Sequence, residues 1–329
     1  MMKSRVLITG IAGFLGNYLA NCLRDNNYEV WGMDCCDSGG SRLNSSIIMR
    51  RGDICSAEEM NLVLEECRPD VVYHLAAQSS VAFSWQEPAS TMKINLEGTI
   101  NLLETVRNLH LSSRILLIGS GEEYGPISPQ ELPINEDKLP CPQNPYSLSK
   151  YFQTMAGMQY FHNFGMDIYF ARPFNHTGPG QKRGFVVPDF ASQVAAIEAG
   201  LQEPVIKVGN LGARRDFSDV RDVVQAYCRI VDQGKPGRIY NVGSGKAIPV
   251  QIILDQLLSL SHTTIKVEVD PNKFRPVDVA TIYGSIARIK DETGWRPCIE
   301  FNNTIKDTLE YWRAKTAKGN DNSNDSATA

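Results

Sequence analysis

Short apolar runs alternate with longer amphipathic stretches through the first half of the chain. The apolar runs are rich in β-branched residues and have the length of strands, whereas the stretches between them repeat apolar positions at helical spacing. The runs read RVLIT at residues 5–9, YEVWGM at 28–33, VVYHLA at 71–76, RILLIG at 114–119 and DIYFAR at 167–172. Because strands that alternate with helices are joined by right-handed crossovers, the pattern predicts an α/β fold with a doubly wound parallel sheet.

Beyond Pro173 the alternation becomes irregular. The pattern there predicts helices at about 185–199 and 219–232, and short isolated strands at VIKVG, RIYNVG and IKVEV. We therefore expect a first domain at residues 1–175 and a smaller α/β substrate-binding lobe at 176–314, interleaved with the first. Residues 315–329 are polar and lack aromatic side chains, so we expect a disordered tail there.

Composition and charge exclude several classes of function. The chain has 329 residues, of which 42% are hydrophobic, which is enough to bury a large core. Its net charge of -4 gives no general reason to bind nucleic acid. Local basic groups remain candidates for binding a small anionic ligand, namely Lys182 with Arg183, Arg214 with Arg215, and Arg275.

Cysteine usage and the longest apolar runs bear on location. The eight cysteines form no C-x-x-C motif, and no Cys/His cluster has the spacing of metal ligands. The apolar stretch near the amino terminus is too short for a signal peptide, and no run approaches the ~18 apolar residues of a membrane span. These features predict a cytoplasmic protein with no metal, no disulfide framework and no membrane segment.

The segment TGIAGFLG joins the first predicted strand to the helix that follows it. Gly10 permits a tight turn, Gly13 lets the backbone approach a pyrophosphate, and Gly16 lets the helix pack on the strand. Phe14 and Leu15 stand at the start of that helix, whose amino-terminal end would face the anion. This arrangement predicts dinucleotide binding in a Rossmann-like fold.

Further cofactor contacts are expected where the next strands end. The second strand ends at Asp34, whose carboxylate can accept hydrogen bonds from both ribose hydroxyls and would repel a 2'-phosphate. NAD(H) is therefore favoured, and NADP(H) stays possible. Asp53 and Ile54 would lie near the adenine. The chain would also pass close to the cofactor at Leu75, Ala76 and Ala77.

The segment NPYSLSK carries a candidate for proton transfer. Tyr146 and Lys150 are four residues apart, on one face of a helix that Asn144 and Pro145 are suited to begin. An ammonium beside a phenol stabilises the phenolate, so we expect Lys150 to lower the pKa of Tyr146 towards working pH. Ser120 stands at the carboxyl end of a predicted strand, where ligands bind in open parallel sheets. The three side chains can thus converge on one substrate hydroxyl or carbonyl.

Together these motifs resemble the extended short-chain dehydrogenase/reductases that act on nucleotide-diphosphate sugars. The resemblance covers about residues 4–313 and is greatest to the GDP-mannose branch of that family. It rests on the following segments in this order: TGIAGFLG, HLAA, SGEEYG, PYSLSK, ARPFNHTGPGQ, RRDFSDVRD, YNVGSG and RPVDV.

The resemblance implies roles for residues of the second lobe. Asn175 would hold the sugar diphosphate, and Arg215 and Arg275 would neutralise its phosphates through their guanidinium groups. His176 would contact the nicotinamide half of the cofactor. Val186 would line the nucleotide pocket.

It also implies the chemistry. Members of the family transfer a hydride between C4 of the sugar and the nicotinamide, while the tyrosine moves the hydroxyl proton. A dehydratase in addition expels the C6 hydroxyl, and it usually carries Asp or Ser where this chain has Gly121, between Ser120 and Glu122. We therefore expect reduction of the 4-keto group of GDP-4-dehydro-6-deoxy-D-mannose, to GDP-D-rhamnose or its C4 epimer, with Tyr146 as proton donor.

Three alternatives stay open. Glu122 is the carboxylate that a GDP-mannose 4,6-dehydratase would use as its base, and Glu123 is expected to be a structural or solvent-facing neighbour. Asp34 suits an NAD-dependent 4-epimerase, because reductases and dehydratases of this branch often prefer NADP(H). A regulator that senses NAD(P) on the same scaffold would usually lack Tyr146 or Lys150, and both are present.

The helix that begins at NPYSLSK is apolar around much of its circumference. One face would pack on the sheet, and the resemblance implies that another lies in a two-fold homodimer with a four-helix interface. Burial wholly within the monomer is the alternative. The residues that carry this surface are Tyr151, Phe152, Met155, Met158, Tyr160 and Phe161.

Overall fold

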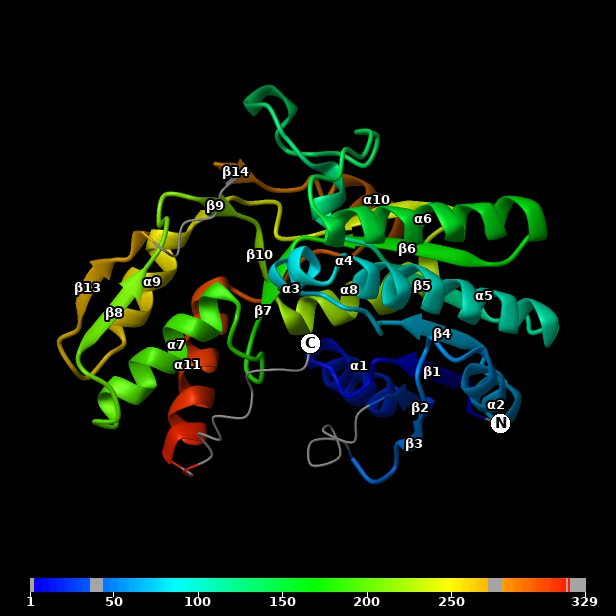
Figure 1. The fold of residues 1–329 in the computed structure, drawn as a ribbon, viewed down its shortest axis with the longest axis horizontal. Coiled ribbons are helices and arrows are strands. Elements are labelled where there is room, and N and C mark those ends of the chain that lie inside the picture. Colours follow the sequence, from blue (N-terminus) through cyan, green and yellow to red (C-terminus); the bar gives the residue numbers. More distant parts are fainter. Residues whose placement is uncertain (1–2, 36–43, 272–279, 318, 320–329) are drawn as a thin grey trace.

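The centre of the molecule is a parallel sheet (Figure 1). The computed structural model describes residues 3–35, 44–271, 280–317 and 319. Within these residues the main sheet has seven strands in the order β11-β6-β5-β4-β1-β2-β3, and every neighbouring pair is parallel. The strands are β1 (Arg5–Thr9), β2 (Glu29–Asp34), β3 (Ile48–Arg51), β4 (Val71–His74), β5 (Arg114–Ile118), β6 (Ile168–Pro173) and β11 (Ile239–Val242).

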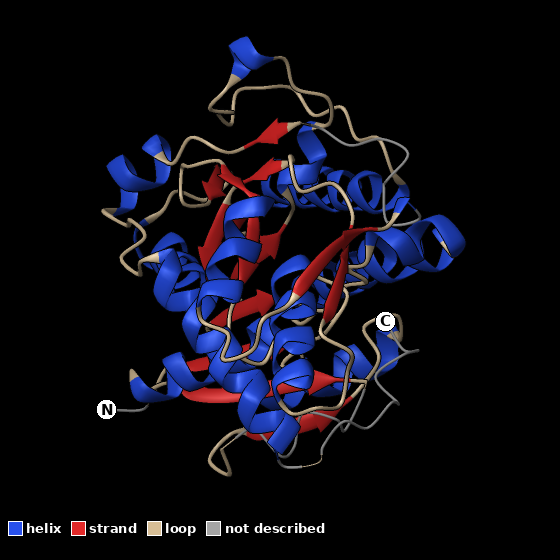
Figure 2. Cartoon of the chain, turned by 90° about the vertical axis from the view of Figure 1, so that its left-hand side faces the viewer, coloured by secondary structure: helices blue, strands red, loops and turns tan. Residues whose placement is uncertain are grey.

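Helices cover both faces of this sheet (Figures 1 and 2). One face packs against α1 (Phe14–Asp25), α8 (Val220–Gln233) and α10 (Ala287–Thr293), and the other against α2 (Ala57–Cys67), α5 (Gly98–Asn108) and α6 (Pro145–Phe164). Both faces of the strands are therefore apolar, which is why their sequences read as continuous hydrophobic runs. The predicted α/β class with a doubly wound parallel sheet is confirmed.

Most of the elements beyond β6 build a smaller lobe beside the sheet. Helices α7 (Val186–Glu198), α9 (Val250–Ser259) and α11 (Phe301–Ala317) enclose its apolar core together with strand β8 (Val205–Val208). Short sheets complete it: β8 with β13 (Lys266–Val269), β7 (Asn175–Thr177) with β10 (Phe217–Asp219), and β9 (Arg214–Arg215) between β12 (Ile248–Pro249) and β14 (Thr281–Ile282).

The structure departs from the sequence analysis at the segment RIYNVG. This segment was expected among the isolated strands of the second lobe, but it forms β11 and pairs with β6 at the edge of the main sheet. Helices α8 and α10 from the same half of the chain also pack on that sheet. The two parts of the chain are thus interwoven.

The predicted tail also needs correction. Helix α11 continues to Ala317, so residues 315–317 are helical and not part of a disordered tail. Residues 318 and 320–329 lie outside the described residues.

Short helices connect the remaining strands. Elements α3 (Val81–Gln86), α4 (Pro88–Met92) and the π-helical turn η2 (Lys93–Glu97) lie between β4 and α5. The 3-10 turns η3 (Gly121–Tyr124) and η4 (Pro129–Glu131) lie between β5 and α6, in a segment that projects at the top of both views (Figures 1 and 2). Turn η3 brings Ser120 to the carboxyl edge of the sheet.

Candidate active site

The turn between β1 and α1 is built around glycines. Gly10 has a φ of +72°, and a Cβ there would lie 2.6 Å from the backbone nitrogen of Ala76. A Cβ on Gly16 would lie 2.5 Å from the carbonyl oxygens of Gly10 and Ile11. No other residue fits either position without moving backbone, so the turn is as tight as the predicted phosphate-binding turn requires. Gly13 is the residue immediately before α1.

The residues predicted to contact the rest of a dinucleotide lie at the ends of neighbouring strands. Asp34 ends β2, and its Oδ2 accepts a hydrogen bond of 2.9 Å from the backbone nitrogen of Ala12 in the glycine turn. Asp53 follows β3, and its Oδ1 accepts a hydrogen bond of 2.9 Å from the backbone nitrogen of Cys55. The side chain of Ile54 is buried in the core beside Gly98, so only its backbone can face a ligand.

Helix α6 holds Tyr146 and Lys150 against the carboxyl end of β5. Asn144 caps the helix by accepting a hydrogen bond of 2.8 Å from the backbone nitrogen of Ser147, and Pro145 occupies the first turn. Lys150 is buried, and its Nζ donates to the carbonyl oxygen of Ile118 and to Oε1 of Gln153, both at 2.9 Å. Tyr146 is only partly buried and neighbours Ser120. Tyr146 and Lys150 thus lie at the end of β5, where Tyr146 hydrogen-bonds to Ser120. That the three side chains act on one substrate atom stays a prediction.

The protonation of Tyr146 differs from the expectation. Burial raises the pKa of Tyr146 to about 12, and the hydrogen bond with Ser120 only partly opposes this rise. Burial also lowers the pKa of Lys150 to about 8, against the effect of the Glu123 carboxylate. The expected lowering of the Tyr146 pKa was therefore wrong, because desolvation and the carboxylates of Glu122 and Glu123 all raise it and only the hydrogen bond with Ser120 opposes them. The phenol is protonated at neutral pH and can donate a proton.

Gly121 is enclosed by aromatic surface. A Cβ at this position would lie 2.9 Å from Cδ1 of Phe174, and the opposite side of the same ring contacts Gly284, where a Cβ would also collide with it. Phe174 is buried and stacks on Tyr124 with ring centroids 6.5 Å apart. The glycine between Ser120 and Glu122 thus leaves room for this ring.

The carboxylates of Glu122 and Glu123 point into different surroundings. Glu122 is partly exposed, and its Oε2 lies 3.5 Å from Nδ2 of Asn144. Glu123 is completely buried and pairs with Arg172 on β6, with Oε2 2.9 Å from Nη2. Glu123 is therefore structural, and the solvent-facing alternative was wrong.

Sequence reasoning did not single out Arg172. The available signal was an arginine inside the apolar run DIYFARP, since a charged side chain in a strand buried on both faces needs a partner. Sequence reasoning also missed His74, whose ring lies between Oγ1 of Thr9 at 2.8 Å and Oγ1 of Thr99 at 3.0 Å.

The second-lobe residues implied by the family resemblance lie along β7, α7 and β9. His176 on β7 stacks its ring on Phe14 of α1, with centroids 6.3 Å apart and planes 3° apart, and burial lowers its pKa. The neighbouring Asn175 is exposed. Val186 begins α7 and is partly buried, as is Arg215 on β9. Arg275 lies outside the described residues.

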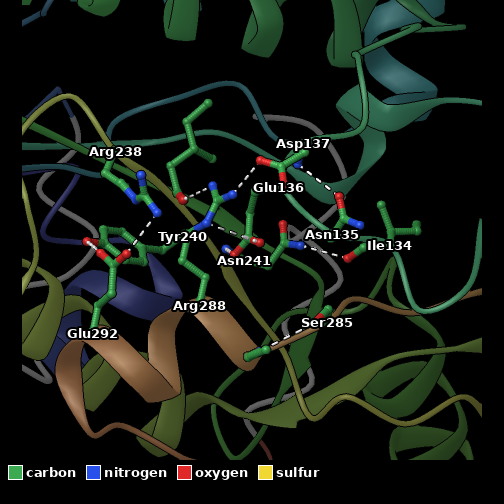
Figure 3. A network of polar contacts seen from close by, with 12 residues as sticks. Ile134, Asn135, Glu136, Asp137, Arg238, Tyr240, Asn241, Ser285, Arg288 and Glu292 are labelled. Atoms are coloured by element: carbon green, nitrogen blue, oxygen red, sulfur yellow. Dashed lines mark hydrogen bonds and ion pairs between the residues drawn. The ribbon is translucent and has the colours of Figure 1, made fainter.

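A polar network attaches the projecting segment before α6 to the sheet edge (Figure 3). Arg288 on α10 points towards the acidic pair Glu136 and Asp137, with Nη2 2.6 Å from Oδ1 of Asp137. Asn241 on β11 donates to the carbonyl oxygen of Ile134 at 2.9 Å and accepts from the hydroxyl of Tyr124 at 2.8 Å. The turn that carries Ser120 is thereby connected to β11.

In the described part of the chain, no group of three or more His, Cys, Asp or Glu side chains could hold a metal ion. In the same residues, no helix combines the length and apolar character needed to cross a membrane.

Comparison with known proteins gives consistent matches along most of the chain. A family model described as GDP-mannose 4,6 dehydratase matches residues 7–308. GDP-6-deoxy-D-mannose reductase from Pseudomonas aeruginosa is 34% identical over 314 residues, which cover 95% of this chain and 99% of that protein.

Solved structures agree with these matches. RMD from Pseudomonas aeruginosa, complexed with NADPH, superposes with a TM-score of 0.83 at 32% identity, covering 95% of this chain and all of that chain (100%). UDP-glucose 4-epimerase from Thermus thermophilus, in complex with NAD, gives a TM-score of 0.85 at 28% identity, with 94% of this chain and 99% of that chain covered.

Proposed function

The chain belongs to the GDP-mannose 4,6-dehydratase family, an NAD(P)-dependent group of nucleotide-sugar enzymes, and within this family we propose that it is a reductase. It reduces the 4-keto group of GDP-4-dehydro-6-deoxy-D-mannose to the alcohol, giving GDP-D-rhamnose or its C4 epimer. The similarity to a GDP-6-deoxy-D-mannose reductase over 95% of the chain supports this substrate class.

The observation that carries the choice of reaction is the packing around Gly121. A dehydratase must protonate the departing C6 hydroxyl, and the position between Ser120 and Glu122 is where a side chain could do so. Here the ring of Phe174 lies 2.9 Å from the position of a Cβ on Gly121, so a side chain there requires the ring to move. Without such an acid, elimination would lose about 10² to 10⁴ in rate. Reduction of an existing ketone needs no such group.

The glycine turn fits a dinucleotide. A Cβ on Gly10 would lie 2.6 Å from the backbone nitrogen of Ala76, so the tight turn needs a glycine there. This turn leads into α1, whose amino terminus would face a pyrophosphate. The residues that would hold the cofactor are Gly10, Gly13, Phe14, Leu15, Gly16, Asp34, Asp53, Ile54, Leu75, Ala76, Ala77, Tyr146, Lys150 and His176.

The side chains at the end of β5 then move the proton. A nicotinamide held by these residues would supply the hydride to C4 of the sugar. Tyr146 Oη gives its proton to the C4 oxygen as negative charge develops there, and Ser120 Oγ orients that oxygen by a hydrogen bond. The Lys150 ammonium stabilises the phenolate that Tyr146 becomes. A phenol that is protonated beforehand, as the raised pKa of Tyr146 requires, suits this direction of reaction.

The remaining assignments complete the substrate site. Asn175 would hold the diphosphate, Arg215 and Arg275 would neutralise it, and Val186 would line the nucleotide pocket. Glu122 would position the sugar, because its carboxylate is partly exposed two residues from Ser120.

NADH is the proposed cofactor. Oδ2 of Asp34 is fixed by the Ala12 amide at 2.9 Å, which holds the carboxylate at the edge of the glycine turn. A carboxylate there accepts hydrogen bonds from ribose hydroxyls and repels a 2'-phosphate.

A homodimer is the proposed assembly. Phe152 and Met155 on α6 are 40% and 48% exposed, and Trp85 on the adjoining α3 is 64% exposed. Tyr160, by contrast, is buried within the monomer, and Met158 and Phe161 pack against the same core. Part of the apolar surface of α6 therefore serves the monomer, and the rest is available to a second copy.

The decisive experiment offers two substrates separately. GDP-mannose is supplied alone, and GDP-4-keto-6-deoxymannose is supplied with NADH or NADPH, while nicotinamide absorbance and product mass are followed. We expect cofactor oxidation and a gain of two hydrogens with the keto sugar, and no reaction with GDP-mannose. Loss of one water from GDP-mannose without net cofactor use would instead identify a dehydratase, which the presence of Glu122 keeps as the second candidate. If neither reacts, UDP- and dTDP-hexoses test the 4-epimerase.

A further inference from the structure

Behind Ser120 lies a buried ion pair that the proposed reaction does not use directly. Glu123 Oε1 accepts a hydrogen bond of 2.8 Å from the backbone nitrogen of Ser120. Oε2 of the same carboxylate accepts from Nε of Arg172 at 2.9 Å, and the Thr154 hydroxyl lies 3.3 Å from it. Neither member of the pair is more than 3% exposed. The carboxylate thus connects the backbone of Ser120 to β6 and α6.

The surrounding residues accommodate this carboxylate. A Cβ on Gly119 would collide with Oε1 of Glu123, so a glycine is needed there. Arg172 also lies over the ring of Tyr124 at 4.9 Å, and the hydroxyl of Tyr124 donates to Asn241. One buried cluster therefore surrounds the backbone of Ser120, formed by Gly119, Glu123 and Arg172.

We propose that Glu123 is a positioning residue for the proton transfer: its carboxylate fixes the Ser120 backbone and keeps the Lys150 ammonium charged. The inference rests on the proposed use of Ser120, Tyr146 and Lys150. It adds a residue that touches neither substrate nor cofactor and acts through two that do.

The electrostatic part follows from what surrounds Lys150. Its Nζ donates to the carbonyl oxygen of Ile118, the residue before Gly119, and Oε1 of Glu123 lies against Gly119. Glu123 thus approaches the ammonium from η3 and the neutral His74 approaches it from β4, while Oε1 of Gln153 accepts from it within α6. Burial lowers the pKa of Lys150 to about 8, and Glu123 raises it. Removing the negative charge would let the pKa of Lys150 fall further, so the ammonium would be lost at lower pH.

The test is the pH profile of kcat in Glu123→Gln. Glutamine keeps the shape and can still accept from the Ser120 amide, but it carries no charge. Because the proposed reaction requires a cationic Lys150, kcat declines on the alkaline side of the profile as Lys150 loses its proton. We expect this decline to begin about one pH unit lower in the variant, with KM changed less than threefold. Glu66→Gln, which removes an exposed carboxylate paired with Arg50, is the matched control and should leave the profile unmoved.

A second variant separates charge from folding. Glu123→Gln with Arg172→Met removes both buried charges, so no ion is left unpaired, and it should show the same shifted decline because Glu123 is the charge that acts on Lys150. Equal loss of kcat at every pH, with the decline unmoved in both variants, would overturn the inference.

The same profiles distinguish this inference from the proposed function. They are recorded with whichever substrate the wild-type protein converts. If the wild type dehydrates or epimerises a sugar instead of reducing the ketone, the proposed reaction is wrong, while the comparison of Glu123→Gln with wild type still tests the role of Glu123.

Discussion

At the scale of single residues, Tyr146 has the clearest assigned role. Its phenol is protonated because burial raises its pKa to about 12, and a proton donor is what ketone reduction needs. Tyr146→Phe should lower kcat by about 10² to 10⁴ because the developing C4 oxyanion then lacks its acid. NADH oxidation with the keto sugar measures this. Tyr151→Phe, at the next tyrosine of α6, is the control. Activity of Tyr146→Phe within tenfold of wild type would refute the phenol as donor.

Asp34 gives a prediction about cofactor choice. Asp34→Ala should lower kcat/KM for NADH by about tenfold or more while changing that for NADPH less, because the carboxylate no longer accepts from the ribose or repels a phosphate. The ratio of the two values is measured under identical conditions. An unchanged ratio would mean that Asp34 does not contact the ribose.

Residue types and spacing were sufficient to predict that Tyr146 and Lys150 lie on one helix at the end of the strand that precedes Ser120. They were not sufficient to predict the burial of Glu123. A carboxylate in a turn has the same local sequence pattern whether it faces water or pairs with an arginine 49 residues away in the chain. The pKa of Tyr146 was missed for a similar reason. Spacing identifies the neighbouring charge of Lys150, but the extent of desolvation depends on the whole fold.

At the scale of elements, His74 links β4 to β1 and α5. Its Nδ1 lies 2.8 Å from Oγ1 of Thr9, and its Nε2 lies 3.0 Å from Oγ1 of Thr99, which itself donates to the carbonyl oxygen of Asn95. Nε2 is thus a donor, and the lowered pKa keeps the ring neutral at physiological pH. Burial lowers its pKa to about 3.

This neutral histidine makes the fold sensitive to acid. The unfolded chain takes up a proton below about pH 6.5, whereas folded His74 does so only near pH 3, so acid favours unfolding in that window. His74 should contribute about 1.4 kcal/mol per pH unit to the fall in unfolding free energy there. In His74→Gln the slope, measured by denaturant unfolding from pH 6.5 to 4, should be smaller by that amount. The exposed His162→Gln should not alter it, and an unchanged slope in His74→Gln would contradict the assignment.

The strands of the main sheet were predictable because each is buried on both faces and bounded by turns. The segment RIYNVG has the same character, but it stands among short strands of the second lobe. Pairing between β11 and β6 joins residues about 70 positions apart, as in Tyr240 with Ala171. No local pattern encodes such a pairing.

At the scale of the whole molecule, the exposed apolar side chains of α6 predict assembly. Phe152→Glu with Met155→Glu should convert the proposed dimer to monomers at micromolar concentration, because charges at the centre of an apolar interface lose their hydration without a partner. Sedimentation velocity measures the change. Leu201→Glu, at a more exposed apolar site on the other lobe, should leave assembly unchanged. Wild-type protein that sediments as a monomer would remove the proposal.

The ring of Phe174 between Gly121 and Gly284 limits how this scaffold can acquire a different reaction. A side chain added at position 121 first meets the ring and costs about 1–3 kcal/mol, whereas shrinking Phe174 first leaves a void that costs about 3–5 kcal/mol. Every path that changes one residue at a time therefore passes through a weakened protein. A library that varies Gly121 and Phe174 together should yield folded variants that two successive single-site libraries miss, which makes the two positions one evolutionary unit.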